Sequence, residues 1–443
     1  MAWYDSAIFY HIYPLGMVGA EKRNDSGAIR RRFSELTVCI PYLKVLGCNA
    51  VYIGPIFESS SHGYDSRDYK QIDRRLGSNE DFCGFVEMAH KCGIRVVVDT
   101  VFNHTGREFF AFQDLLSKGE ESPYRDWYKG VNFGQRSPLG DPFSYSAWHG
   151  VIELPELNFN CEELRKYLVE IVRFWVKEFD IDGLRLDCAD VLDLHFQKSL
   201  RYFTNEMKPE FWLMGEVIHG EYQRWVNPET LHSVTNYELH KSLYSGFNTR
   251  NFFEPAHNLN RNIQIAGELY TFLENHDVDR IASKLDRRED LYPCYAALFT
   301  LPGKPSIYYG GEFALEGRKG KDGDDAPLRP RITEEMKPNE FTSYLAKLSE
   351  IHGRNSELQS GAYREILLQN RRWAYARMEG NGAVLIALSC DDSPAELSLK
   401  LPLKAELAID LLLEEELPLS GDRLQLLLPA HGERIIKLKG ANG

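Results

Sequence analysis

The first 355 or so residues alternate short apolar runs of β-favouring side chains with longer amphipathic stretches. This alternation is typical of parallel strands joined by helices that cover the sheet. Eight strands are predicted, at residues 8–16, 50–57, 94–102, 181–187, 211–216, 232–238, 270–275 and 305–310. The clearest helices are predicted at residues 30–46, 79–92, 161–178, 193–207, 289–300 and 338–353. Eight strand-and-helix pairs favour an α/β fold of the (β/α)₈ TIM barrel type over an open doubly wound sheet.

The alternation is interrupted after the third predicted strand. About 60 residues rich in Gly, Pro, Ser, Trp and Tyr separate this strand from the next clear helix. A loop of that length without structure is improbable in a compact domain. We therefore expect a small inserted subdomain B at residues 104–158, on the catalytic face of a barrel formed by residues 1–103 and 159–355.

The pattern changes again near residue 356, where short segments alternate apolar and polar positions. Such segments occur at residues 373–378, 383–389, 395–401, 424–429 and 433–439. The turn residues between them, such as Gly380-Asn381-Gly382, are typical of antiparallel hairpins. Residues 356–443 are therefore expected to form a separate C-terminal antiparallel β-sandwich.

Charge and cysteine usage restrict the class of protein. A formal net charge of −13 argues against nucleic acid or an anionic membrane as the main partner, because phosphate binding needs basic patches. No apolar run approaches the roughly 18 residues that cross a bilayer. The eight cysteines lack metal-type CxxC spacing, and the first residues lack an export signal. We expect a cytoplasmic protein with free thiols, while its oligomeric state is left open.

Polar residues end several of the predicted strands. The third strand runs into DTVFNH (99–104), the fourth ends at Arg185-Leu186-Asp187, the fifth at Gly215-Glu216, and the seventh runs into ENHD (274–277). Because the carboxyl ends of barrel strands converge on one site, these side chains should meet there.

Three of these residues fit retaining glycoside hydrolysis. This chemistry needs a nucleophilic carboxylate and a carboxylic acid about 5 to 5.5 Å apart, which neighbouring strands can supply. Arg185 lies two positions before Asp187, so both side chains should point the same way and the guanidinium should keep Asp187 ionised. We interpret Asp187 as the nucleophile, Glu216 as the general acid/base and Asp277 as a ligand of sugar hydroxyls. A single Asp at a strand end is more often a cap, but capping does not explain all three positions.

These motifs resemble the four signature regions of the α-amylase family of glycoside hydrolases, in order. The matching segments are DTVFNH, GLRLDCAD (183–190), GEV (215–217) and FLENHD (272–277). The resemblance implies a retaining enzyme that cleaves α-glucosidic bonds of an oligosaccharide substrate through a covalent glycosyl-enzyme intermediate. It also implies that HGYD (62–65) supplies a ring for sugar stacking and that a D-x-x-x-R segment binds sugar hydroxyls. The substrate-binding residues implied in this way are Tyr64, Asp65, His104, Arg185, His276, Asp325 and Arg329.

Two details resemble particular groups within the family. LPELN (154–158) is similar to the MPKLN signature of neopullulanases, cyclomaltodextrinases and maltogenic amylases, which implies short malto-oligosaccharides or cyclodextrins with mainly α-1,4 bonds. Cleavage of α-1,6 bonds is left open. Asp190-Val191 replaces the Lys-His whose His helps to hold calcium in typical starch-cleaving enzymes, so no metal or other cofactor is expected, although Asn103 keeps calcium open.

Two further expectations concern the amino-terminal part of the chain and the aromatic residues of the insert. The first strand begins within the first ten residues, so the extra amino-terminal β domain of the neopullulanase group is expected to be absent. Aromatic residues of the insert are expected to form stacking platforms for sugars, namely Trp127, Trp148 and Tyr145.

Four alternative functions are kept open. A transglycosylase or isomerase of the same family would use the same intermediate while excluding water. A conventional endo-acting α-amylase would favour long chains. A non-catalytic binding barrel would be expected to lack one of the three carboxylates. A metal-dependent barrel hydrolase would use Asp99, His104, His276 and Asp277, which lack the close His spacing such sites often show.

Overall fold

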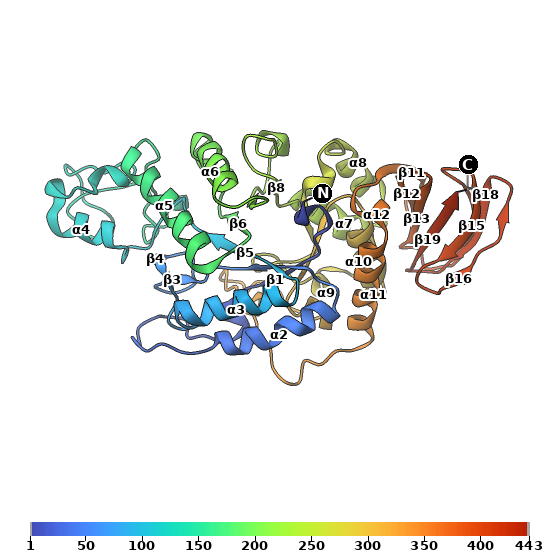
Figure 1. Cartoon of the computed structure of the whole chain (residues 1–443), viewed down its shortest axis with the longest axis horizontal. Helices are drawn as coiled ribbons and strands as arrows, with labels where there is room; N and C mark the ends of the chain where they lie inside the picture. Colours follow the sequence, from blue (N-terminus) through green and yellow to red (C-terminus); the bar gives the residue numbers. More distant parts are fainter. Residues whose placement is uncertain (1, 441–443) are drawn as a thin grey trace.

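The computed structural model describes residues 2–440, and within them eight parallel strands form the predicted TIM barrel (Figure 1). Their order around the barrel is β8-β7-β6-β5-β2-β1-β10-β9. A parallel bridge between Thr235, next to β8, and Tyr270 of β9 joins the two ends and closes the barrel. The strands are β1 (Phe9–Ile12), β2 (Ala50–Ile53), β5 (Arg95–Thr100), β6 (Gly183–Leu186), β7 (Trp212–Gly215), β8 (Ser233–Val234), β9 (Tyr270–Phe272) and β10 (Lys304–Tyr308).

All six predicted helices are present around the barrel. They are α2 (Phe33–Val45), α3 (Asn79–Lys91), α5 (Glu162–Phe179), α6 (Leu194–Met207), α10 (Leu291–Thr300) and α11 (Glu340–Arg354). Short helices α1 (Pro14–Met17), α9 (Ile281–Lys284) and α12 (Ser356–Gln359) connect other elements. Outward-facing strand residues such as Val96, Val98 and Leu184 pack into the same apolar core as these helices.

The segment after the fifth barrel strand differs from the prediction. The strand expected at 232–238 ends at Val234, and two helices that were not predicted follow it, α7 (Tyr237–Asn248) and α8 (Phe253–Arg261). The Asn236 side chain accepts a hydrogen bond from the backbone N–H of Leu239, so it caps the start of α7. An N-cap satisfies a free backbone donor, which favours the helix over a longer strand here.

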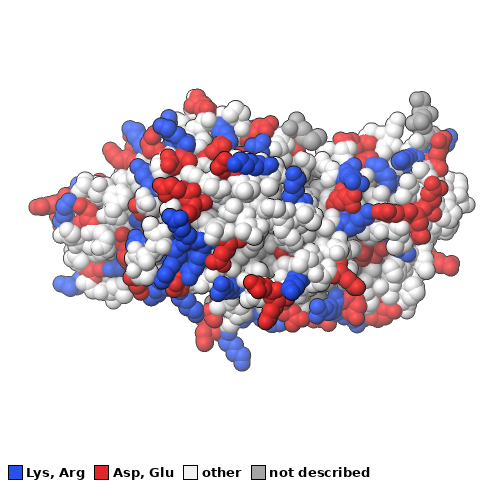
Figure 2. Space-filling model, turned by 60° about the horizontal axis from the view of Figure 1, so that its bottom comes forward, with Lys and Arg blue, Asp and Glu red and all other residues white. Residues whose placement is uncertain are grey.

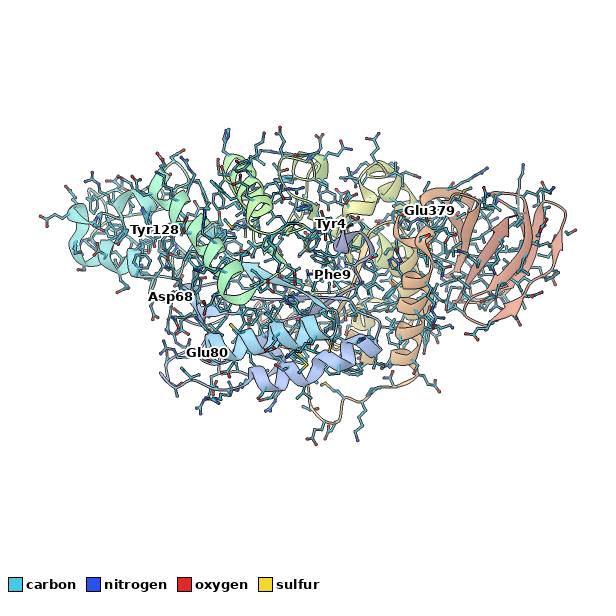
Figure 3. The ribbon with its side chains drawn as sticks, in the orientation of Figure 1. Tyr4, Phe9, Asp68, Glu80, Tyr128 and Glu379 are labelled. Carbon is cyan, nitrogen blue, oxygen red and sulfur yellow. The ribbon has the colours of Figure 1, made fainter. Side chains whose placement is uncertain are left out.

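The barrel interior has an apolar end and a polar end. At the amino ends of the strands, Phe9, labelled in Figure 3, lies inside the barrel. Its ring stacks on Trp212 with centroids 4.9 Å apart and contacts Tyr270 edge-on. At the carboxyl ends, the buried interior side chains include Arg185 and Asp99. The barrel interior is therefore a packed apolar core at the amino ends of the strands and a polar site at their carboxyl ends.

A two-stranded hairpin that was not predicted lies between β2 and α3. Its strands are β3 (Phe57–Ser59) and β4 (Ser66–Ile72), paired antiparallel. The turn between them contains HGYD, and Gly63 has a φ of +94° there. A Cβ at Gly63 would also meet Pro55 at 2.5 Å, so glycine is required for the turn that presents Tyr64.

Residues 104–158 extend from the carboxyl end of β5 to one end of the elongated molecule (Figure 1). They contain α4 (Phe110–Lys118) and an aromatic core in which Phe112 contacts Phe143 and Tyr128, the last labelled in Figure 3. The bridge from His104 to Glu156 ties the two ends of the segment together, and the bridge from Tyr128 to Leu157 ties its middle to its end.

Two of the three predicted stacking platforms are wrong. Trp127 is buried against Tyr124 and Tyr167, and Tyr145 packs on Phe112. The Tyr145 hydroxyl also donates to the Ile152 carbonyl at 3.0 Å and contacts Arg107. Both rings therefore stabilise the insert, because its small core needs large apolar side chains.

The C-terminal part forms the predicted antiparallel β-sandwich, at the other end of the molecule (Figure 1). Leu385 and Ile436 of the larger sheet pack on Leu399, Leu424 and Leu426 of the smaller one. The larger sheet has the order β11 (Ala362–Leu368), β12 (Arg372–Glu379), β13 (Gly382–Ser389), β19 (Glu433–Gly440), β15 (Ala405–Asp410) and β16 (Glu415–Glu416). The smaller has the order β14 (Ala395–Lys400), β18 (Arg423–Leu428) and β17 (Leu419–Ser420).

The sandwich is joined to the barrel by buried polar contacts. The Tyr375 hydroxyl lies 2.6 Å from the Thr300 hydroxyl, and Arg377 donates to the Thr300 carbonyl at 3.0 Å. Trp373 packs near Phe252 at the same junction.

The surface charges and the cysteines can be compared with the expectations from the sequence. Acidic and basic side chains are interspersed over the face in Figure 2. Within residues 2–440, no helix combines the length and the hydropathy needed to span a membrane. All eight cysteines are free thiols, as predicted.

Candidate active site

A cavity of about 1310 Å³ opens at the carboxyl ends of the barrel strands. The predicted residues that line it are Tyr64, His104, Asp187, Glu216, Asp277, Asp325 and Arg329, and Trp148 of the insert lines it as well. The β3–β4 hairpin, the insert and the loops after β6, β7, β9 and β10 form its walls.

Arg185 lies at the centre of the site and contacts three carboxylates. Its Nη1 donates to Asp99 Oδ1 at 2.9 Å and to Asp187 Oδ1 at 2.8 Å. Its Nη2 forms an ion pair with Glu216 Oε1 at 2.8 Å. The expected common direction of Arg185 and Asp187 is confirmed, but the contact with Glu216 was not predicted.

Asp187 and Glu216 lie close together at the carboxyl ends of β6 and β7. One oxygen of each carboxylate and the Cys188 sulfur all lie within 4.8 Å of one another. Burial raises the pKa of Asp187 to about 8, the nearby Glu216 and Asp99 carboxylates act in the same direction, and Arg185 opposes them. Burial therefore outweighs Arg185, and the prediction that the guanidinium keeps Asp187 ionised near neutral pH is wrong.

Asp277 faces this pair from the loop after β9. Its Oδ1 accepts from Arg329 Nη2 at 3.0 Å, and its Oδ2 lies 3.0 Å from His276 Nε2. Burial opposes ionisation, but His276 and Arg329 hold the pKa of Asp277 well below its usual range. Arg329 Nη2 also donates to Asp325 Oδ2 at 3.0 Å, so Asp277 and Asp325 share one guanidinium.

Tyr64 links the turn of the β3–β4 hairpin to Asp99 and to His276. Its hydroxyl donates to Asp99 Oδ2 at 2.9 Å and lies 2.6 Å from His276 Nε2. Its ring stacks on the His276 ring, with centroids 5.6 Å apart. His104 Nε2 contacts the Tyr64 carbonyl at 3.1 Å, and burial lowers the pKa of His104 to about 4, so this His is neutral at pH 7. The Tyr64 ring is therefore held in place by contacts at its hydroxyl and at its backbone carbonyl.

Asp65 has a different position from the other predicted ligands. Its carboxylate accepts from the Ser61 backbone N–H at 3.0 Å and from the Ser61 hydroxyl at 2.6 Å. Like Arg185 and His276 it is not among the residues that line the cavity, but those two contact the predicted catalytic carboxylates. The structure therefore places Asp65 as the side chain that closes the hairpin turn.

Three tyrosines that were not identified from the sequence contact residues of the site, namely Tyr13, Tyr52 and Tyr237. Tyr52 donates to Asp99 Oδ2 at 2.8 Å, and the Arg329 guanidinium lies 4.6 Å from the centre of the Tyr13 ring. Both tyrosines lie inside the strands predicted at 8–16 and 50–57 and not at their ends, so the search for polar residues at strand ends did not select them. The Tyr237 hydroxyl lies 3.4 Å from Glu216 Oε1. Tyr237 lies near the end of the strand predicted at 232–238, which is a signal that could have found it, although the structure places it on α7.

The four residues of the metal-hydrolase alternative do not come together as ligands. Within residues 2–440, the group of His, Cys, Asp and Glu close enough to hold an ion consists of Asp187, Cys188 and Glu216. Asp99, from the alternative set, is occupied by Arg185 and two tyrosine hydroxyls.

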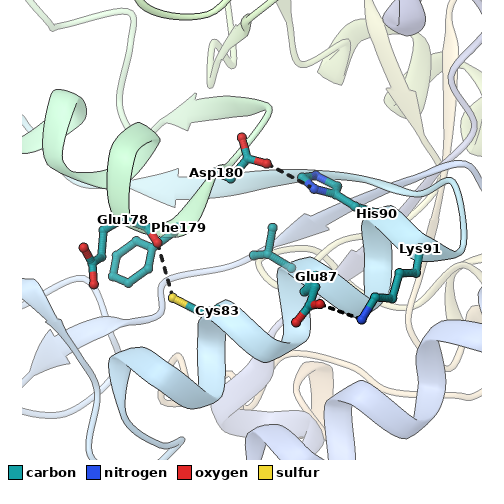
Figure 4. Close-up of a pocket in the computed structure, with 8 residues that line it drawn as sticks. Cys83, Glu87, His90, Lys91, Glu178, Phe179 and Asp180 are labelled. Carbon is teal, nitrogen blue, oxygen red and sulfur yellow. Dashed lines mark hydrogen bonds and ion pairs between the residues drawn. The ribbon is translucent and has the colours of Figure 1, made fainter.

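A second surface hollow of about 520 Å³ lies between α3 and α5 (Figure 4). Its charged side chains contact one another: Lys91 lies 2.5 Å from Glu87, and His90 Nδ1 lies 3.4 Å from Asp180. Cys83 Sγ contacts the Glu178 carbonyl at 3.3 Å. This hollow lies in the helix layer, and the predicted catalytic residues do not line it.

Comparisons with known proteins agree on one family. Residues 34–359 match the family described as alpha amylase, catalytic domain. The chain is 31% identical over 452 residues to a cyclomaltodextrinase from Thermoanaerobacter pseudethanolicus, covering 96% of this chain and 76% of the relative. It is 32% identical over 375 residues to neopullulanase 2 from Thermoactinomyces vulgaris, covering 78% of this chain and 63% of that enzyme.

The solved structures similar to this chain include a cyclomaltodextrinase, as the relatives similar in sequence do. A cyclomaltodextrinase superposes with a TM-score of 0.88 at 25% identity, over 99% of this chain and 78% of that one. A debranching enzyme from Nostoc punctiforme superposes with a TM-score of 0.82 at 28% identity, over 98% of both chains.

Proposed function

The chain belongs to the α-amylase family of glycoside hydrolases, and from that premise we propose that it hydrolyses α-glucosidic bonds of short malto-oligosaccharides and cyclodextrins with retention. The observation that carries the proposal is the closeness of Asp187 and Glu216, since one oxygen of each carboxylate lies within 4.8 Å of the other and Arg185 bridges the two groups. Retaining enzymes hold their carboxyl groups about 5 to 5.5 Å apart, whereas inverting enzymes need about 6.5 to 9.5 Å to admit a water molecule.

In the proposed reaction, Asp187 attacks the anomeric carbon while Glu216 protonates the leaving oxygen. The glycosidic C–O bond breaks and a covalent glycosyl-enzyme forms. Glu216 then removes a proton from water, which attacks the same carbon and releases Asp187. The ion pairs of Arg185 with both carboxylates hold them at reacting distance. Asp277, ionised beside Arg329, can accept hydrogen bonds from sugar hydroxyls.

The preference for short substrates rests on the walls of the cavity. Trp148, Val151 and Leu154 of the insert close one side, and the loop carrying Asp325 and Arg329 closes another. A cavity of about 1310 Å³ that is bounded by these walls holds a limited number of sugar units, which suits short or cyclic substrates. The names of the relatives, cyclomaltodextrinase and neopullulanase, support the same substrate class.

The test is a product analysis of the purified protein on maltotriose, β-cyclodextrin, pullulan, panose and soluble starch. We expect α-anomeric products by NMR at early time, and a higher kcat/KM for maltotriose or β-cyclodextrin than for starch, compared per cleavable bond. Products of β configuration would contradict retention. Rapid loss of starch viscosity at low conversion would indicate an endo-acting α-amylase, and products longer than the substrate would indicate a transglycosylase.

We also propose that the enzyme needs no metal and works in the cytoplasm. The Asn103 amide lies 3.3 Å from His104 Nδ1, and its main-chain carbonyl accepts from Leu157, so these groups have protein partners. The eight free thiols suit a reducing compartment. Activity and unfolding temperature should be unchanged after dialysis against EDTA. A loss restored by calcium would contradict the metal proposal, and recovery of the native protein in an exported fraction would contradict the location.

A further inference from the structure

Cys188 directly follows the proposed nucleophile, at the point where the chain leaves β6. Its φ is +48°, in the left-handed region that L-residues seldom adopt. A non-glycine residue in this region must be fixed by its surroundings, and such residues are concentrated at functional sites. The neighbouring turn packs tightly on β7, because a Cβ at Gly215 would lie 2.7 Å from Ala189 Cβ. The position of Cys188 is therefore set by the packing of two strands.

The contacts of Cys188 reach both proposed catalytic carboxylates. Its thiol donates to Asp187 Oδ2, with the sulfur 3.1 Å from the oxygen. Its backbone N–H donates to Glu216 Oε2 at 3.2 Å. The other oxygen of Asp187, Oδ1, accepts from Arg185. The two oxygens of the nucleophile thus have donors of very different strength, since a thiol is a weak donor and a guanidinium is a strong one.

We propose, on the basis of the function proposed above, that Cys188 is a positioning residue whose thiol orients Asp187 Oδ2 as the attacking oxygen. Oδ1 remains bound to Arg185 while Oδ2 forms the bond to the anomeric carbon. The glycosidic bond breaks at the same time, and the leaving oxygen receives the proton of Glu216. The thiol keeps its own proton throughout, and its weak hydrogen bond is given up at small cost as Oδ2 becomes bonded to carbon.

The surroundings keep Cys188 in the form that can donate. Burial, followed by the charges of Asp187 and Glu216, raises the pKa of the Cys188 thiol well above its usual range. Because the thiolate is the reactive form of cysteine, this thiol is not a competing nucleophile. Its hydrogen bond favours the ionised form of Asp187 and so opposes, as the smallest of the contributions, the rise in the pKa of that carboxyl that burial causes.

The pH dependence of Asp187 depends on every charged or titratable group that faces the site. These groups come from β1, β2, β5, β6, the end of β7, the β3–β4 hairpin, α7 and the loops after β1, β5, β9 and β10. They are Arg185, Asp99, Glu216, Asp277, Asp325, Arg329, His11, His104, His276, Tyr13, Tyr52, Tyr64 and Tyr237. Replacing Cys188 leaves all of them in place, so a change in the acid limb of the pH profile reports the lost thiol.

The experiment compares Cys188→Ala and Cys188→Ser with the wild-type enzyme. Serine retains a donor at the same position, and Cys161→Ser, at the start of α5, is a matched control outside the cavity. The quantity measured is kcat/KM from about pH 4.5 to 8, on maltotriose and on an aryl α-maltoside with a good leaving group. Cys188→Gly, which suits the positive φ, supplies a thiol-free enzyme if the alanine variant does not fold.

We expect Cys188→Ala to lower kcat/KM about tenfold on both substrates, with KM nearly unchanged, because every leaving group needs the nucleophile. Its acid limb should move to higher pH by about half a unit, because Asp187 loses a hydrogen bond that favours its charged form. Cys188→Ser should restore both values to within about threefold of wild type.

Three results would overturn the inference. They are an unchanged acid limb and rate in Cys188→Ala, a loss that serine does not restore, and a loss confined to maltotriose, which would assign the effect to Glu216. Each can occur while Asp187→Asn is inactive, in which case the proposed function stands. An active Asp187→Asn enzyme would instead overturn the proposed function itself.

Discussion

The two ends of the barrel interior are built from the same strands but from opposite kinds of side chain. On β7, Trp212 and Met214 belong to the apolar cluster, and Glu216 follows directly at the carboxyl end. On β1, Phe9 belongs to that cluster, while His11 is buried nearer the site. The amino end gains stability from apolar burial and aromatic stacking. The carboxyl end buries charges that must be compensated by one another, as Arg185 does for three carboxylates.

This difference separates stability from catalysis along a single strand. Residues at the amino end should affect folding with little effect on turnover, and residues at the carboxyl end should do the reverse. The following variants test that separation, beginning with the largest expected effect.

Asp187→Asn should lower kcat by roughly four orders of magnitude or more, because the covalent step loses its nucleophile. The fold should be retained, since asparagine has nearly the same shape and can still accept a hydrogen bond from Arg185. The measurements are turnover on maltotriose and the unfolding temperature by circular dichroism. Retention of even a tenth of wild-type turnover would show that Asp187 is not the nucleophile.

Glu216→Gln should cause a loss that depends on the leaving group. On maltotriose kcat/KM should fall by roughly 10³-fold, because the leaving oxygen is no longer protonated. On an aryl α-maltoside with a good leaving group, the loss in kcat/KM should be much smaller, since that group departs without a proton. Equal losses on both substrates would exclude Glu216 as the general acid.

Trp212→Ala should test the apolar end of the barrel. Trp212 is fully buried between Phe9 and Trp3, so truncation should lower the free energy of unfolding by about 3 to 5 kcal/mol. The kcat per folded molecule should stay near the wild-type value. Tyr202→Ala, at an aromatic residue that is 60% exposed, is the matched control and should change stability little. A large fall in kcat without a loss of stability would show that the two ends are not separable.

Asp182→Asn gives the smallest expected effect and adds a pH dependence. Asp182 lies at the amino end of β6, next to His90 at 2.7 Å and Lys208 at 3.1 Å. Burial opposes its ionisation, but His90, Lys208 and the Val96 N–H lower its pKa to about 2. A depressed carboxyl pKa stabilises the fold above about pH 4, and this stability is lost as the pH falls through about 2.

The expected cost of Asp182→Asn is therefore about 2 kcal/mol near neutral pH, decreasing toward zero in acid, with kcat unchanged. Urea unfolding at a series of pH values measures it. A cost that stays constant down to about pH 2 would show that the charge of Asp182 is not what stabilises this end.

The sequence by itself determined the barrel, the sandwich and the proposed catalytic residues. Period-two apolar runs and amphipathic helices are local patterns, and they are strong because each strand must bury its side chains. Asp187, Glu216 and Asp277 were found because residues that follow parallel strands of a barrel must lie at the same end of it. The early end of strand β8 and the helix α7 after it were not predicted, because an Asn cap favours the helix there.

The tertiary structure alone decided which side chains meet in the cavity. Arg185 contacts Asp99 from 86 positions earlier and Glu216 from the next strand, and no local pattern specifies such a shared ion pair. Trp127 and Tyr145 are as aromatic as Trp148, yet the small core of the insert buries the first two and leaves the third at the cavity. The contacts of Asp65 within its turn and of Cys188 with Asp187 were likewise decided by the tertiary structure. The direction of a side chain depends on backbone angles and on packing between distant segments, which the order of residues does not reveal locally.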